Sequence, residues 1–145
     1  MILLVSGARA HPSRPFVEAE LTRRWSPVAE VWQGAARGVD EWAGLWATAR
    51  TMTVRDFPVG WDHLADPPNA VEIPDETPNE RNQRMVDAAL KALNTAGNGH
   101  FVCNVLAFPD GSKGGTWDLV RRARVAGFRV VVCEVPDPRQ ESLFG

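Results

Sequence analysis

The sequence is poor in the features that mark several common classes of protein. Among its 145 residues there are only two cysteines and three histidines, and the formal net charge is only −2. Cys103 and Cys133 both fall in apolar segments of strand length, so we expect two buried free thiols and no disulfide. The histidines lack metal-ligand spacing, and we expect no metal site. The small net charge gives no general reason to expect nucleic acid or a membrane surface as a partner.

Long apolar runs are missing as well. No segment approaches the roughly 20 apolar residues of a membrane-spanning helix, and residues 1–5 are too short for the core of a signal peptide. We therefore expect a cytoplasmic protein with no membrane partner. There is no internal repeat or low-complexity tract, and 44% of the residues are apolar and 23% charged, as in a single globular domain. We expect this domain to span residues 1–136 and a polar tail to follow at 137–145.

What the sequence does contain is an alternation of short apolar segments with amphipathic ones. The segments expected to form strands are residues 2–5, 28–32, 51–57, 101–108 and 130–135. Between them, apolar residues recur at helical spacing, as with Val17, Leu21 and Trp25. The alternation predicts an α/β fold, namely a Rossmann-like, doubly wound parallel sheet of five strands in the order 3-2-1-4-5, with helices on both faces.

The alternation is interrupted by residues 58–78, which carry five prolines and several acids. We expect a long loop there rather than a domain linker, since the alternation resumes after it. The next helix is expected to begin at Glu80, to keep Arg84 on its surface, and to end at Gly97 or Gly99.

Glycine-bearing turns follow three of the predicted strands, at residues 6–9, 34–40 and 109–116. In a sheet of this order, the carboxyl ends of strands one, two and four open onto one crevice at the switch in strand order. The backbone N–H groups of such turns, and the positive end of the dipole of a following helix, suit a phosphate or another anion. We therefore expect a phosphate-binding loop and a ligand crevice at these turns.

The basic and hydroxyl side chains of these turns each have two interpretations. Arg9 and Arg37 follow turn glycines and would bind phosphate bidentately, or they form surface ion pairs. Lys113 would neutralise a phosphate, or it is a solvated loop residue. Thr116 would hydrogen-bond the ligand, or it caps the following helix.

The acidic and aromatic candidates also have two interpretations each. Asp40 and Asp118 stand where the first turn of a helix is expected, where the helix dipole favours them; as ligand contacts they would accept from ribose hydroxyls or a base amine. Trp42 and Trp46 lie on an apolar helix face and are expected in the core. Trp61 and Trp117 are the two tryptophans that would cover a base.

Taken in order along the chain, several motifs resemble the YspA-like, cpYpsA-related branch of the SLOG superfamily. These motifs are Ser6-Gly7-Ala8-Arg9, Gly34-Ala-Ala-Arg-Gly-Val-Asp40, Phe57-Pro-Val-Gly-Trp61, Glu80-Arg-Asn82 and Ala107-Phe-Pro…Gly115-Thr-Trp-Asp118. The resemblance covers about residues 2–135 and implies a Rossmann-like fold that binds a nucleotide or nucleotide-derived ligand; it names no cofactor. The ligand-binding residues expected from turns and resemblance together are Gly7, Arg9, Gly34, Arg37, Gly38, Asp40, Asn82, Pro109, Gly111, Lys113, Gly114, Gly115 and Thr116.

The same superfamily includes LOG-type enzymes, which cleave the bond between a base and ribose 5′-monophosphate. Their motif is Pro-Gly-Gly-x-Gly-Thr-x-x-Glu, whereas this chain has Pro109-Asp110-Gly111, two extra residues, and Leu119 at the position of the glutamate. Arg81 matches their catalytic arginine. The alternative to binding is thus an N-glycosidic hydrolase or base-transferring enzyme acting on a nucleoside monophosphate, with Arg81 and Asp118 as its catalytic residues. Related folds often pair, so a homodimer is also expected as an option.

Overall fold

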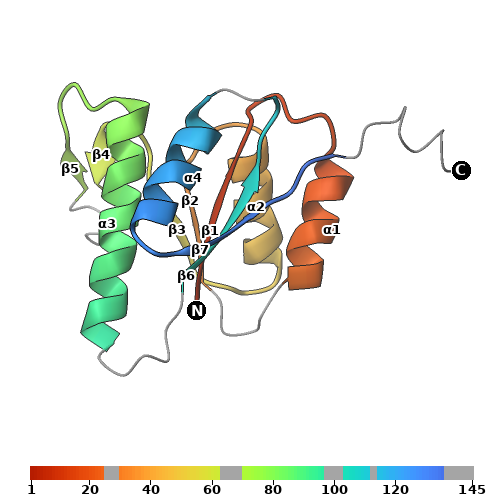
Figure 1. Cartoon of the computed structure of the whole chain (residues 1–145), viewed down its shortest axis with the longest axis horizontal. Coiled ribbons are helices and arrows are strands. Elements are labelled where there is room, and N and C mark those ends of the chain that lie inside the picture. The colour runs from red at the N-terminus through yellow and green to blue at the C-terminus, as the bar shows by residue number, and fades with distance from the viewer. Residues whose placement is uncertain (25–29, 63–69, 97–102, 112–113, 136–145) are drawn as a thin grey trace, which may run out of the picture.

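A computed structural model of the chain describes residues 1–24, 30–62, 70–96, 103–111 and 114–135. Its centre is a parallel sheet of five strands in the order β3-β2-β1-β6-β7 (Figure 1). The strands are β1 (Ile2–Gly7), β2 (Glu30–Gln33), β3 (Val54–Asp56), β6 (Cys103–Phe108) and β7 (Arg129–Val132). Counted along the chain as strands one to five, they have the predicted order 3-2-1-4-5. The expected Rossmann-like α/β fold is confirmed.

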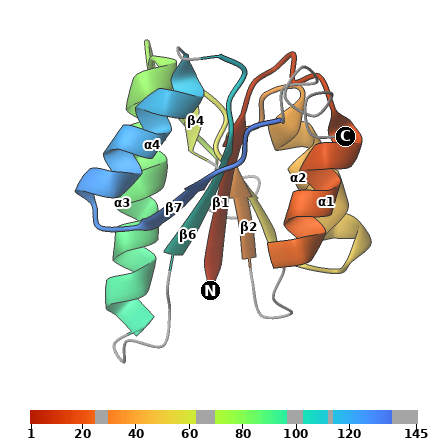
Figure 2. The same cartoon turned by 45° about the vertical axis from the view of Figure 1, so that its right-hand side comes forward.

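Helices cover both faces of this sheet. They are α1 (Arg14–Arg24), α2 (Val39–Ala49), α3 (Pro78–Ala96) and α4 (Gly115–Val125). Helices α1 and α2 lie on one side of the sheet, and α3 and α4 on the other (Figure 2). Each helix begins near the carboxyl ends of the strands because every crossover between parallel strands must return the chain to the opposite edge.

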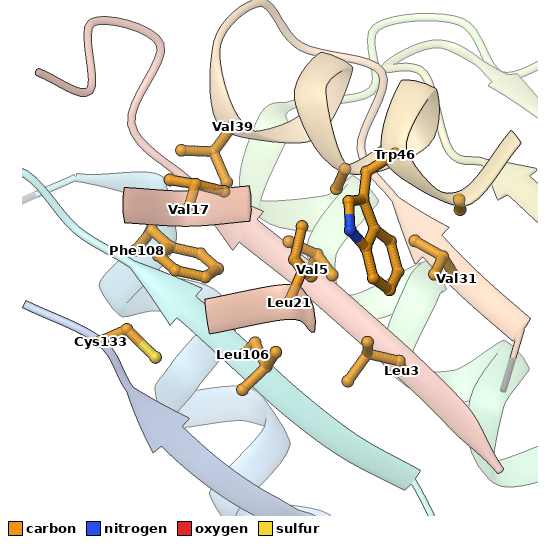
Figure 3. Close-up of a cluster of buried hydrophobic side chains, with 12 residues drawn as sticks. Leu3, Val5, Val17, Leu21, Val31, Val39, Trp46, Leu106, Phe108 and Cys133 are labelled. Atoms are coloured by element: carbon orange, nitrogen blue, oxygen red, sulfur yellow. The ribbon is translucent and has the colours of Figure 1, made fainter. Parts of the chain in front are cut away.

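The two faces of β1 explain why its sequence is an uninterrupted apolar run. Successive side chains of a strand point to opposite faces, so Leu3 and Val5 pack under α1 and α2, while Ile2 and Leu4 pack under α3 and α4. Figure 3 shows the first of these clusters, in which the indole of Trp46 on α2 lies between Val5 of β1 and Val31 of β2. Trp42 is partly buried against the same cluster, so both tryptophans of α2 belong to the core, as expected.

Several element boundaries differ from those expected. Strand β1 continues to Gly7, and α3 begins at Pro78, two residues before the predicted Glu80. Thr77 and Glu80 cap this helix reciprocally: Glu80 N–H donates to Thr77 Oγ1, and Thr77 N–H donates to Glu80 Oε1, both at 3.1 Å. This is a capping box, with a proline at the first helical position where its missing N–H costs nothing.

The proline-rich segment is not structureless. It holds β4 (Trp61–Asp62) and β5 (Val71–Glu72), which form a separate antiparallel pair next to α3 (Figure 1). The expectation of a plain loop over 58–78 is wrong in this respect, because strands of two residues show no periodicity in the sequence. Some of the predictions concern residues outside the described ones, namely Trp25, Val28, His63, Gly97, Gly99, His100 and the polar tail.

Both cysteines are buried free thiols, as predicted. Burial raises the pKa of the Cys103 thiol to about 12. In the part of the chain that the structure describes, no helix combines the length and the apolar character needed to cross a bilayer. The same described residues contain no group of three side chains arranged to hold a metal ion.

Candidate functional site

A crevice of about 300 Å³ lies at the carboxyl edge of the sheet, where the strand order reverses between β1 and β6. The residues that line it are Ser6, Gly7, Ala8, Arg9, Ala36, Asp40, Pro78, Arg81, Asn82, Asp110, Gly114, Gly115 and Thr116. They come from the turns after β1, β2 and β6 and from the first turns of α2, α3 and α4. The three predicted turns therefore do meet at one crevice.

Close packing of glycines brings the start of α2 against the end of β1. A Cβ atom on Gly7 would lie 2.5 Å from Cβ of Val39, the first residue of α2. A Cβ on Gly38 would overlap the carbonyl oxygens of Ala8, at 2.7 Å, and of Arg9. Gly38 also has a φ of 77°, a left-handed conformation that other residues rarely adopt. These glycines are needed for packing, and their effect is to set Asp40 at the crevice.

Asp40 is buried, with 4% of its surface exposed. Its Oδ2 accepts from the N–H of Ala36 at 3.4 Å, whereas its Oδ1 has no hydrogen-bond partner among the described residues. Burial raises the pKa of Asp40 to about 6, against the opposing effect of Arg81 and the backbone N–H groups of Ala36, Gly34 and Gly7. A buried carboxylate with a free oxygen in a crevice is the arrangement expected of a functional group.

Arg81 stands beside Asp40, on α3. A Cβ on Gly34 would lie 2.6 Å from Nη1 of Arg81 and 2.9 Å from Oδ2 of Asp40, so only a glycine allows both side chains to approach this turn. Nη1 donates to the carbonyls of Gly34 and Phe57, the latter at 2.8 Å, and Nε donates to Oδ1 of Asn82 at 3.1 Å. Burial lowers the pKa of the Arg81 guanidinium, and Asp40 opposes that shift.

Asp118 lies behind the crevice and is not among its lining residues. Its carboxylate accepts from Arg122 Nε at 2.8 Å, from Arg121 Nη2 at 3.0 Å and from Asn82 Nδ2 at 3.1 Å. Burial alone would raise the pKa of Asp118, but these bonds, that from Arg122 first, hold it below its usual value. Asn82 also donates to the carbonyl of Gly115 at 3.1 Å. Asp118 thus fixes α3 to the first turn of α4.

The turn before α4 has open space beside its glycines, unlike the turns that follow β1 and β2. Gly111 and Gly114 have φ values of 89° and 118°, and a Cβ on Gly111, Gly114 or Gly115 would meet no atom of a described residue within 4 Å beyond its neighbours in the chain. The N-cap residue is Gly114, which brings no side-chain cap. Thr116 is therefore not the N-cap, and its buried side chain lies on the crevice wall.

The remaining predicted residues divide between the crevice and its surroundings. Arg9 is exposed on the crevice rim, whereas Arg37 lines a neighbouring hollow of about 400 Å³ over α2, which shares Ala36 with the crevice. Pro109 lines a neighbouring hollow together with Asp110 and Trp117. Lys113 lies outside the described residues.

Neither tryptophan that was expected to cover a base lines the crevice. Trp61 is 45% exposed on β4, and Trp117 donates from Nε1 to the carbonyl of Gly111 at 2.9 Å. Trp117 faces the neighbouring hollow, which shares Asp110 with the crevice.

Arg84 was predicted to lie on the surface of α3, and this prediction is wrong. Its side chain is 17% exposed and forms an ion pair with the nearly buried Glu76 at 2.8 Å. It also donates to the carbonyl of Pro58 at 2.9 Å, and Glu76 accepts from the N–H of Gly60 at 2.9 Å. This pair ties the β3–β4 connection to α3. Five lining residues were not among the predicted site residues: Ser6, Ala8, Ala36, Pro78 and Asp110. The Thr77–Glu80 capping box was the signal that would have brought Pro78 to the crevice.

No family model matches the chain, and no curated protein is detectably similar to it. The fold and the crevice therefore define its class: it is a Rossmann-like α/β protein with a small polar crevice at the switch point of the sheet.

Proposed function

We propose that this protein binds a nucleotide or a nucleotide-derived ligand in the crevice, with the ligand's phosphate at the beginning of α4. The observation that carries this proposal is the meeting of two complementary features in one crevice. One is an open glycine turn at a helix N-terminus, and the other is a buried carboxylate with a free oxygen.

The phosphate side of the crevice is formed by the first turn of α4. The first N–H groups of a helix have no partner within the helix and carry the positive end of its dipole. Gly114 and Gly115 leave space beside these groups, and Thr116 adds a hydroxyl on the same wall. Arg9 on the rim supplies a guanidinium, which suits phosphate geometry.

Calorimetry or thermal shift against AMP, NAD, ADP-ribose and cyclic nucleotides tests the proposal. A ligand at one hundred times its Kd would stabilise the folded protein by about 2.7 kcal/mol. In Arg9→Ala we expect affinity to fall about three- to tenfold through loss of charge-assisted bonds. The matched control is Arg124→Ala, which removes an exposed arginine near the other end of α4. If none of these ligands stabilises the wild-type protein, the proposal is wrong.

For the alternative function, hydrolysis of an N-glycosidic bond, the two candidate catalytic residues are Arg81 and Asp118, and only one of them lines the crevice. Arg81 lines the crevice, but the oxygens of Asp118 are engaged by Asn82, Arg121 and Arg122. Release of free base from AMP would favour the enzyme. Full activity in Asp118→Asn would remove Asp118 from its mechanism.

A further inference from the structure

Asp40 is unusual among the polar residues of the crevice because its burial is not compensated by a full set of partners. Oδ1 has no hydrogen bond to a described residue, and no described cation lies within the 4 Å of an ion pair. Burying a carboxylate without partners is unfavourable. Its place in the first turn of α2 accounts for a negative charge there. The backbone N–H groups of Ala36, Gly34 and Gly7 also favour the ionised carboxylate, and that of Ala36 donates to Oδ2. None of these groups forms a hydrogen bond to Oδ1.

The groups that face Asp40 restrict what its partner can be. Arg81 approaches from α3 across Gly34, and its Nε and Nη1 are already used by Asn82 and two carbonyls. Arg9 lies on the rim and Asp110 on the wall after β6. Next to Asp110 is the buried imidazole of His11, on which Asp110 exerts a charge effect. The two arginines disfavour a cationic partner, and the carboxylate itself disfavours a phosphate. A neutral hydrogen-bond donor remains.

The size of the crevice indicates which part of a nucleotide supplies that donor. At about 300 Å³ it lies at the lower end of the range for ligand pockets, about 300–1,000 Å³. It suits a sugar phosphate better than a whole nucleotide. With the phosphate at the first turn of α4, the sugar is the neutral, donor-bearing group next to it. The adjoining hollow beside Trp117 leaves room for a base outside the crevice.

We infer that Oδ1 of Asp40 accepts a hydrogen bond from a hydroxyl of the ligand's ribose, and that this contact makes the crevice selective for ribosyl over deoxyribosyl phosphates. The inference rests on the proposed function and specifies its ligand class. It concerns recognition, and no bond is made or broken. Because burial raises the pKa of Asp40 to about 6, a hydroxyl that donates to the ionised form also makes binding release a proton near that pH.

The experiment compares AMP with 2′-deoxy-AMP and 3′-deoxy-AMP by calorimetry. In the wild-type protein at least one deoxy ligand should bind about tenfold or more weakly than AMP, the loss of a hydrogen bond to a charged group. Asp40→Asn keeps the shape of the side chain and should reduce this ratio several-fold, and Asp40→Ala should bring it close to one. Glu41→Gln is the matched control, since Glu41 is the exposed neighbouring acid in the same helical turn; it should keep the wild-type ratio.

A second measurement uses only the wild-type protein, and it tests the inference even if the Asp40 variants do not fold. Between about pH 7.5 and pH 5.5, AMP should lose more affinity than the discriminated deoxy ligand. The phosphate of both ligands titrates alike near its second pKa of about 6, and Asp110 and His11 act on both ligands equally. The difference between the two pH profiles therefore isolates the hydroxyl contact.

The outcomes separate this inference from the proposal on which it depends. Equal binding of AMP and both deoxy ligands would overturn the inference and leave the binding function intact. So would a ratio that persists in Asp40→Ala, or two parallel pH profiles. Failure of AMP, ribose 5-phosphate and inorganic phosphate alike to bind would overturn both.

Discussion

The glycines after β1 and β2 and those after β6 belong to similar turns in the sequence but have different surroundings in the structure. A Cβ on Gly7 or Gly34 would lie within 2.6 Å of another side chain, so these positions are closed by the protein itself. A Cβ on Gly114 or Gly115 would meet no atom within 4 Å in the part of the chain that the structure describes. The first group is explained by packing alone. The second group leaves space that no described residue fills, and it is this space that favours a ligand.

The largest effect is expected for Gly38→Ala, in the closed group. The new methyl would overlap the carbonyls of Ala8 and Arg9 in a left-handed backbone conformation. We expect a loss of about 2–5 kcal/mol in the free energy of unfolding, measured with chemical denaturant. The control is Gly44→Ala in the middle of α2, where a Cβ would have its nearest atom at 3.4 Å; this change should be neutral or slightly stabilising. Unchanged stability in Gly38→Ala would show that packing does not require a glycine at this position.

The second prediction concerns Asp40, the carboxylate that the closed turns position. Its pKa is raised from 3.8 to about 6 in the folded protein, so the folded state holds a proton that the unfolded state has already lost between these values. The free energy of unfolding should therefore fall by up to about 3 kcal/mol as the pH rises from about 4 to about 7.

In Asp40→Asn this part of the pH dependence should disappear, and the variant should be at least as stable as the wild type at about pH 7.5. Glu41→Gln, at the exposed neighbouring acid, should keep the wild-type profile. If the free energy of unfolding depends on pH in the same way in the wild type and Asp40→Asn, burial does not raise the pKa of Asp40.

The fold could be predicted from the sequence because its determinants are local and repetitive. Uninterrupted apolar runs such as that of β1 indicate strands covered on both faces, and the handedness of crossovers limits the strand orders available. The pair β4 and β5 could not be predicted, since two residues are too few for a pattern. The start of α3 was misplaced because Thr77 and Pro78 were read as the end of a proline-rich loop.

The location of the crevice was predictable, but the state of each side chain in it was not. Asp40 and Asp118 occupy the same position in the sequence pattern, the first turn of a helix after a glycine-bearing turn. Asp118 is saturated by partners from α3 and α4, whereas Asp40 keeps a free oxygen. The difference depends on residues far apart in the chain, Asn82 above all, and no local pattern contains it.

A third prediction tests the open group with Gly115→Ala. Because the added methyl meets no atom of a described residue and alanine is favourable in a first helical turn, stability should change by less than about 1 kcal/mol. If a phosphate occupies the adjoining space, affinity for AMP should fall about tenfold or more in calorimetry. The control is Gly44→Ala, in the middle of α2, where a Cβ would have its nearest atom at 3.4 Å and which does not line the crevice. It should leave AMP affinity unchanged. A Gly115→Ala protein that binds AMP like the wild type would show that the open turn is not a ligand wall.

The smallest effect is expected for Arg37→Ala. Arg37 and Arg9 look equivalent in the sequence, as exposed arginines that follow turn glycines, but Arg37 lines the hollow over α2 and Arg9 the crevice. An exposed charge that does not contact the ligand acts on it only through solvent, where salt screens it. Removal of Arg37 should therefore change AMP affinity less than about twofold in calorimetry, against about three- to tenfold for Arg9→Ala. Equal losses in the two variants would mean that the ligand reaches across the closed turn of Gly34 and Gly38 into the hollow over α2. The closed glycines would then be part of a binding surface after all, and the distinction between the two groups would fail.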